Sequence, residues 1–406
     1  MTAGPPFRDD LLSTLEVPLV AAPMAGGPSS PELVAAVSRA GGLGMLAGGY
    51  QAADALHEQI QQVRRALAAD DPRSETLPAE TSPDGTPTGK TPPDGTLRVE
   101  IDGAGHAEAG RPFGVNLFTP ESCPTDPEAL ATFRRRWVAT VRELDDELGR
   151  AAAEQPLPVR TDDGWSEKIR LLLEDPVPLV SFTFGLPPER TVRDLQERGT
   201  VVVVSVASLE EALRAARLGP DALVVQGPEA GGHRATLSQD VAPGRTPLAD
   251  LLPEVVSALG RVSATGRGLP VIAAGGIGTR EQAASLLGAG AVAVQVGTLF
   301  VVAQEAGTSA AHRQALLEAA ASGQIRTVVT RAFSGRPARA LATAYTAAMA
   351  PHQIAGYPEV NSLASPVRRA AAAAGRTELV HLWAGTGAAA CRERPAAGIV
   401  DLFRGL

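Results

Sequence analysis

Short apolar runs recur along the chain, and a helical pattern follows each of them. The runs are rich in Val, Ile, Leu and Ala, and Gly or Pro residues bound them. Continuous apolar runs of this length are typical of parallel strands that are buried on both faces. We expect eight strands, at Val17 to Ala22, Leu43 to Ala47, Phe113 to Phe118, Leu179 to Phe184, Val201 to Val206, Ala222 to Gln226, Pro270 to Ala274 and Ala291 to Val296.

Helices are expected between these strands, and three of them carry both a start and a stop signal. Their limits are Pro31 to Gly41, Ser208 to Gly219 and Thr279 to Gly288. Pro, Ser and Thr favour the first positions of a helix, and Gly favours its end. Eight strands in strict alternation with helices favour a closed barrel over a doubly wound sheet. The expected fold class is therefore α/β, a (β/α)8 TIM barrel.

Two segments depart from this rhythm. Residues 71–111 are rich in Pro, Gly, Asp and Thr, with too little apolar content to form a core, so we expect a mobile surface insertion. Its Gly89-Lys90-Thr91 is similar to a P-loop, but Gly85 stands one residue too close. Residues 307–406 are Ala-rich and largely helical in pattern. We predict a barrel over residues 1–306 and a covering region over residues 307–406 that completes the barrel mouth.

Composition and charge narrow the classes of partner. Apolar residues make up 44% of the chain but aromatic residues only 4%, so the core must be built from Ala, Val and Leu. The net charge is -8, which provides no positive field for nucleic acid or anionic lipid. The two cysteines, Cys123 and Cys391, form no disulfide framework or zinc motif, and no metal is expected. The N-terminus lacks a signal-peptide pattern and no apolar stretch is long enough for a bilayer, so we expect a cytoplasmic protein without a membrane partner.

Glycine-rich turns follow the last two predicted strands. In a barrel of this class, the loops at these two positions often bind phosphate. Ala274, Gly275 and Gly276 lie just before the predicted helix start, where backbone N–H groups can bind an anion. Gln295, Gly297 and Thr298 follow the eighth strand and add close backbone approach and a hydroxyl. We predict one phosphate-binding site formed by both loops.

The segment Gln226 to Arg234 ends the sixth strand and contains His233 after two glycines. Histidine is the side chain best suited to proton transfer near neutral pH, so His233 is the candidate acid or base. A histidine that only hydrogen-bonds the backbone remains the alternative. We expect Glu229 and Arg234 to form an ion pair that holds the loop. Solvated or capping roles are expected for the other histidines, which are His57, His106, His312, His352 and His381.

Two further strand ends offer groups for a flat ligand. At the first strand, Pro23 fixes the backbone beside Ala22, and Met24 provides a soft apolar contact. A plain turn would explain this segment as well. Asn116 is polar within the apolar third strand, and a buried amide needs a partner such as the ring amide of a ligand.

These motifs together resemble the nitronate monooxygenase family, formerly called 2-nitropropane dioxygenases, over nearly the whole chain. The motifs Gly356 to Val360 and Leu382 to Gly385 resemble its C-terminal part. The resemblance implies an FMN-dependent barrel enzyme, with His233 catalytic, that oxidatively denitrifies alkyl nitronates, and by extension nitroalkanes, with O2. From the strand ends and the resemblance together, the expected cofactor-binding residues are Ala22, Pro23, Met24, Asn116, Gln226, Gly231, Gly232, Ala274, Gly275, Gly276, Gln295, Gly297 and Thr298.

Three alternatives remain open from the sequence. Flavin-dependent enoyl-acyl-carrier-protein and quinone reductases, which use NAD(P)H, share the Glu229 to His233 motif. A nucleotide dehydrogenase needs a cysteine nucleophile on a barrel loop, and neither Cys123 nor Cys391 is placed for that role. A non-catalytic flavin-binding protein would leave His233 idle. The sequence also leaves open whether His233 acts neutral, as a base on a nitroalkane, or protonated, as a donor to a nitronate oxygen.

Overall fold

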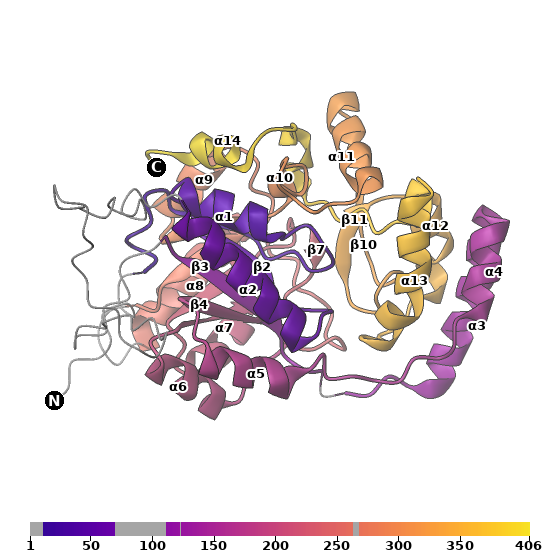
Figure 1. Ribbon diagram of the computed structural model, residues 1–406, viewed down its shortest axis with the longest axis horizontal. Helices are drawn as coiled ribbons and strands as arrows, with labels where there is room; N and C mark the ends of the chain where they lie inside the picture. The colour runs from indigo at the N-terminus through magenta and orange to yellow at the C-terminus, as the bar shows by residue number, and fades with distance from the viewer. Residues whose placement is uncertain (1–10, 70–110, 122, 263–267) are drawn as a thin grey trace, which may run out of the picture.

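The computed structural model describes residues 11–69, 111–121, 123–262 and 268–406 (Figure 1). The predicted insertion at residues 71–111 lies outside the described residues, apart from Arg111. None of the described helices combines the length and the apolar character that crossing a membrane would require.

Eight parallel strands form the central sheet, in the order β1-β9-β8-β6-β5-β4-β3-β2. A parallel bridge between Val20 and Leu43 joins the two edge strands, so the sheet closes into a barrel. The TIM-barrel prediction is therefore confirmed. The strands are β1 (Leu19–Ala21), β2 (Gly44–Ala47), β3 (Phe113–Phe118), β4 (Leu179–Thr183), β5 (Val201–Val206), β6 (Ala222–Gln226), β8 (Val271–Ala274) and β9 (Ala293–Val296).

The predicted strands agree with the observed ones to within two residues at either end. The larger differences are at starts: β1 begins at Leu19 rather than Val17, and β9 begins at Ala293 rather than Ala291. The amide of Val17 donates to the carbonyl of Gly41 and not to a neighbouring strand, so this residue lies before the ladder although it is fully buried. The hydrophobic pattern indicates which residues are buried, and the buried segment extends beyond the residues that pair in the sheet.

The barrel helices lie between the strands as expected. The predicted start signals are confirmed, because Ser30 caps the helix that begins at Pro31, Ser208 accepts from the amide of Glu211, and Thr279 forms a capping box. The helices are α1 (Pro31–Arg39), α2 (Ala53–Ala68), α3 (Pro127–Leu144), α4 (Asp146–Glu154), α5 (Trp165–Glu174), α6 (Glu189–Glu197), α7 (Leu209–Ala216), α8 (Leu248–Val262) and α9 (Arg280–Gly288).

The chain after β9 forms more than helices. Strands β10 (Thr327–Thr330) and β11 (Ala338–Leu341) form an antiparallel hairpin, and β11 pairs with β7 (Gly232–His233). The expectation of a largely helical region overlooked this small sheet because its strands have only four residues. The remaining elements are α10 (Thr298–Val301), α11 (Ala310–Ser322), α12 (Ala344–Ala348), η2 (Ala350–His352), α13 (Glu359–Ala373), η3 (Thr377–Leu379), η4 (Thr386–Ala390), α14 (Ala396–Val400) and η5 (Asp401–Phe403).

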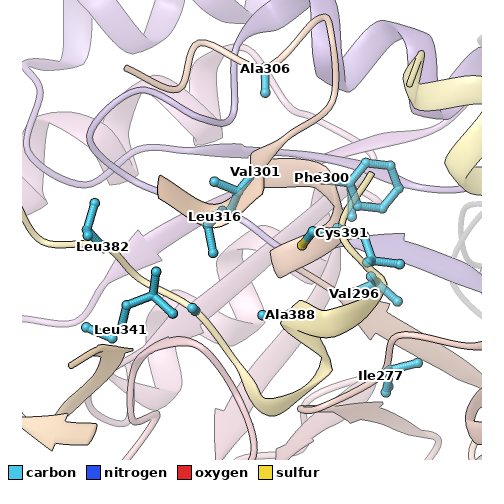
Figure 2. Packing of buried hydrophobic residues seen from close by; sticks show 14 of the residues in the cluster. Ile277, Val296, Phe300, Val301, Ala306, Leu316, Leu341, Leu382, Ala388 and Cys391 are labelled. Carbon is cyan, nitrogen blue, oxygen red and sulfur yellow. The ribbon is translucent and has the colours of Figure 1, made fainter. Parts of the chain in front are cut away.

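The C-terminal region shares its core with the barrel. In Figure 2, Val296 at the end of β9 and Phe300 of α10 lie near Ala388 and Cys391, and all four belong to one buried apolar cluster. Helices α3 and α4 lie beside α12 and α13, away from the barrel strands (Figure 1). The division at residue 306 stays a prediction. Because the later segment packs on the strand ends, it can contribute side chains to a site there.

Candidate active site

One cavity lies at the carboxyl ends of the barrel strands, and all of the candidate residues from the sequence line it. Parallel strands bring their carboxyl ends to one face of a barrel, which explains why residues far apart in sequence meet here. The candidate residues in the lining are Ala22, Pro23, Met24, Asn116, Gln226, Gly231, Gly232, His233, Ala274, Gly275, Gly276, Gln295, Gly297 and Thr298.

The loop after β8 forms a bare backbone surface. Gly275 and Gly276 have φ values of +122° and +71°, which favour glycine. A Cβ atom on Gly276 would lie 2.7 Å from the Cβ of Glu229, so no larger residue fits without movement. The amide of Gly276 makes no hydrogen bond within the described residues. A free amide just before the capped start of α9 can bind an anion.

The loop after β9 adds a hydroxyl to this surface. Gly297 precedes α10, and a Cβ on it would lie 3.3 Å from the Cβ of Ala22. The Thr298 hydroxyl accepts a hydrogen bond of 3.0 Å from the amide of Gly385. Since this bond uses only a lone pair of the oxygen, the hydroxyl hydrogen can still be donated to a ligand.

Asn116 lies on β3 and is 2% exposed. Its Nδ2 atom donates to the Ser181 hydroxyl at 2.9 Å and to the Thr183 hydroxyl at 2.9 Å. These bonds fix the orientation of the amide and leave Oδ1 without a protein donor among the described residues. A side-chain oxygen in this position can accept a hydrogen bond from a ring N–H of a ligand.

Gln226 positions the histidine loop. Its Nε2 atom donates to the carbonyl of His233 at 3.1 Å, and its Oε1 atom accepts from the amide of Ala235 at 3.0 Å. His233 itself lies in β7, opposite Ala338 of β11. Both ends of the Gln226 amide are thus engaged with the loop, so this residue acts on the site chiefly through the position of His233.

The imidazole of His233 contacts Ser334, a residue that the sequence did not single out. Nε2 lies 2.8 Å from Ser334 Oγ, and that hydroxyl also donates to the carbonyl of Arg336 at 3.2 Å and accepts from its amide at 3.3 Å. All of these groups are satisfied together if Nε2 carries the hydrogen and donates to Ser334. The lone pair then resides on Nδ1.

The Nδ1 atom of His233 is open to the cavity. It makes no hydrogen bond within the described residues, and it is absent from the buried polar atoms that lack a partner. Burial lowers the pKa of His233 to about 3, and the positive charges of Arg336 and Arg368 contribute to this shift. His233 is therefore neutral at pH 7 and can accept a proton at Nδ1.

Two sequence interpretations require correction. Arg234 does not form the expected ion pair with Glu229; its guanidinium donates to the carbonyl of Gly227, and Glu229 accepts from the amide of Leu248. This arginine is 1% exposed, so the buried guanidinium satisfies backbone acceptors where water is excluded. Glu229 raises the pKa of Arg234 only as a smaller cause, against a larger lowering by burial.

His312 and His381 are not solvated as expected. His312 is 5% exposed, lines the cavity and has its Nε2 atom 3.1 Å from the carbonyl of Trp383. Burial lowers the pKa of His312 to about 4 and that of His381 well below its usual range. Polar neighbours along the sequence concealed this burial, because the covering region encloses both residues only after folding.

Aromatic rings surround His233. Ring centroids lie 5.2 Å away for Trp383, 5.5 Å for Phe184 and 6.2 Å for Tyr357. The sequence did not single out Phe184, which extends past the end of β4 with a φ of +79°. Other aromatic residues, such as Phe133, Trp137 and Phe300, lie elsewhere in the core, so no sequence signal marked the rings around His233.

The family model for nitronate monooxygenase matches residues 9–72 and 87–403. A probable nitronate monooxygenase of Staphylococcus saprophyticus is 30% identical over 380 residues, covering 92% of this chain and 90% of the relative. One from Bacillus subtilis is 30% identical over 376 residues, covering 92% and 91%.

Two solved structures are similar to this chain over nearly its whole length. The nitroalkane oxidase of Streptomyces ansochromogenes has a TM-score of 0.76 and 34% identity, covering 97% of this chain and 96% of that one. FabK from Thermotoga maritima has a TM-score of 0.62 and 25% identity, covering 98% and 94%. The resemblance found in the sequence is confirmed: this chain is an oxidoreductase and belongs to the nitronate monooxygenase family.

Proposed function

We propose that this enzyme uses FMN and O2 to oxidise alkyl nitronates, and that it also accepts neutral nitroalkanes. The observation that carries the proposal is a neutral His233 whose Nδ1 faces a cavity with no carboxylate among the described residues that line it. An anionic substrate is not repelled there. Arg336 and Arg368 add positive potential close to His233.

The lining residues fit FMN. The free amide of Gly276, just before the start of α9, and the hydroxyl of Thr298 would hold the phosphate. The free oxygen of Asn116 would accept from a ring N–H, and Met24 would lie against the ring system. When bound, FMN accepts two electrons from the substrate and passes them to O2.

The protein itself has to manage one proton and one negative charge. With a neutral nitroalkane, Nδ1 of His233 takes the proton from the carbon next to the nitro group. Ser334 holds the imidazole in the tautomer that this step requires, and Gln226 holds its backbone. A preformed nitronate has already lost this proton, so His233 then serves to position the anion.

The test is anaerobic mixing of the purified protein with propyl-1-nitronate, followed by analysis of the bound cofactor. We expect the flavin absorption to bleach within seconds of mixing and to return when O2 is admitted. We also expect denaturation of the protein to release FMN. Release of FAD, or no bleaching by any nitronate, would overturn the proposal.

A further inference from the structure

A wall of aromatic rings leads from His233 to the outside of the cavity. Phe184 lies 5.5 Å from His233 between ring centroids, Phe118 lies 4.5 Å from Phe184, and Tyr50 lies 5.2 Å from Phe118. Tyr357 closes the group, 5.4 Å from Phe184 and 6.4 Å from Tyr50. We call Tyr50, Phe118, Phe184 and Tyr357 the aromatic wall. Tyr50 is its outermost member, with 38% of its surface exposed.

The backbone of this wall is held in a rare conformation. Among the described residues, the non-glycine residues with positive φ are Tyr50 at 66°, Asp163 at 60° and Phe184 at 79°. Two of them belong to the aromatic wall and the third binds one of these. Left-handed backbone costs about 1 kcal/mol or more for such residues, and it persists where the surrounding structure enforces it. Such residues cluster at functional sites.

Asp163 and Lys168 provide that enforcement for Tyr50. The amide of Tyr50 donates to Oδ1 of Asp163 at 2.9 Å. Oδ2 of the same carboxylate accepts from Nζ of Lys168 at 2.8 Å, and the lysine side chain is 2% exposed. A buried ammonium fixes the carboxylate more rigidly than a surface pair would. These two residues therefore hold Tyr50 from outside the cavity.

The rings of Tyr50 and Tyr357 lie 6.4 Å apart between centroids, and each hydroxyl group affects the pKa of the other. Two hydroxyls carry two hydrogens, and a bond between them would use only one. No other acceptor for either hydrogen exists among the described residues. Burial raises the pKa of Tyr50 to about 12, so both hydroxyls remain protonated donors at pH 7. The pair therefore keeps one free O–H donor, and Tyr50 lines the cavity that contains His233.

We infer that Tyr50 is a substrate-binding residue: the Tyr50–Tyr357 pair donates its free O–H to an oxygen of the bound anion, and Asp163 and Lys168 are positioning residues for Tyr50. The inference rests on the proposed function for the nature of the anion, a nitronate. The aromatic wall contacts the alkyl chain, which favours short unbranched substrates. Neither Asp163 nor Lys168 lines the cavity.

The experiment separates binding from turnover. Butyrate has the shape and charge of propyl-1-nitronate but cannot be oxidised, so isothermal titration calorimetry with butyrate measures anion binding alone. We expect Tyr50→Phe, which keeps the ring, to raise the Kd for butyrate about 10-fold. The KM for propyl-1-nitronate should rise by a similar factor, while kcat stays within about twofold.

Asp163→Ala should reproduce this loss of affinity, and the neighbouring Asp162→Ala is the matched control that should not. If Asp163→Ala fails to fold around an unpaired Lys168, the double variant Asp163→Ala/Lys168→Met removes both charges and carries the test. Rescue of affinity is expected in Asp163→Asn/Lys168→Met, because the Asn oxygen keeps an acceptor for the Tyr50 amide and no buried ammonium is left unpaired.

The outcomes are distinct. Equal butyrate affinity in wild type and Tyr50→Phe overturns the inference while the proposed function stands. Loss in Tyr50→Phe without loss in the Asp163 variants overturns the positioning role. If butyrate binding depends on Tyr50 but no nitronate is oxidised, the proposed function fails and the anion site remains.

Discussion

Nε2 of His233 lies 2.8 Å from Oγ of Ser334, although 101 residues separate them in the chain. His233 belongs to β7 at the barrel mouth, and Ser334 belongs to the turn between β10 and β11. The covering region therefore completes the site, because it supplies the group that selects the tautomer of the candidate base. The small sheet β10-β11-β7 holds the two residues in register.

Replacement of His233 tests its role as a base. His233→Asn should retain bound flavin and lower turnover of neutral nitroalkanes by about 10^2 to 10^4, the usual contribution of a positioned acid or base. Activity on preformed nitronates should fall less, since their proton is already gone. The matched control is His57→Asn, at a half-buried histidine of α2 that does not line the cavity. Equal, small losses on both substrates would leave His233 a structural residue.

Ser334 offers a subtler change at the same site. Ser334→Ala removes the acceptor for Nε2–H, so the imidazole can adopt the tautomer in which Nδ1 carries the hydrogen. We expect kcat on nitroethane to fall about 10-fold or more and the nitronate reaction to change little. Steady-state kinetics with both substrates measure this difference. Unchanged kinetics with nitroethane would contradict the assigned tautomer.

The sequence predicts the barrel well because its evidence is local. Each strand is a continuous apolar run, and the turns at Gly275, Gly276 and Gly297 are visible as glycines. The residues that act through distant partners could not be found in this way. Ser334 and Phe184 reveal their roles only through tertiary contacts, and the burial of His381 depends on the packing of Phe333 and Trp383 against it. Local pattern cannot encode such partners.

The glycine surface can be tested with two substitutions that share the same backbone strain. Gly276 and Gly323 have φ values of +71° and +67°, so the positive φ alone should cost alanine about 1 kcal/mol of stability at either position. A Cβ at Gly276 also meets the Cβ of Glu229 at 2.7 Å, whereas one at Gly323 meets nothing within 4 Å. Gly276→Ala should therefore displace the loop that carries the free amide and lose most of its bound flavin, and Gly323→Ala should keep it. Equal flavin content, measured by absorbance per chain, would argue against a phosphate site at Gly276.

Three imidazoles with lowered pKa values make the fold sensitive to acid. Burial lowers the pKa of His233 to about 3, of His312 to about 4, and of His381 well below 6.5. The unfolded chain binds protons at these histidines near pH 6.5 and the folded chain does not. The free energy of unfolding is therefore highest above that pH and decreases as the pH falls toward 4. Each imidazole should cost at most about 1.4 kcal/mol per pH unit.

Urea unfolding from pH 7 to pH 4.5 measures this slope. His312→Gln should make the decline shallower by about one proton, although its stability at pH 7 is lower because the buried site is altered. A decline that is identical in the variant and the wild type would show that the carboxylates of the chain, and not the imidazoles, dominate acid unfolding.

Nicotinamide should be a poor electron donor for this enzyme. NADH would have to place its diphosphate along an accessible basic groove while its ring reached the flavin. The arginines of the covering region near the mouth are committed to the protein. Arg336 is fully buried and pairs with Glu121 at 2.8 Å, and the guanidinium groups of Arg331 and Arg339 donate to backbone carbonyls.

Stopped-flow measurement of anaerobic flavin reduction with NADH, NADPH and propyl-1-nitronate at equal concentrations tests this expectation. We expect the nitronate to reduce the flavin at least about 100-fold faster than either nicotinamide, because Arg331, Arg336 and Arg339 are engaged within the protein and are not free to bind the diphosphate. Arg339→Gln is an informative companion variant: its guanidinium donates to the carbonyl of Pro228, so its loss should loosen the histidine loop and slow the nitronate reaction. Faster reduction by NADPH than by the nitronate would favour a reductase over a monooxygenase on this barrel.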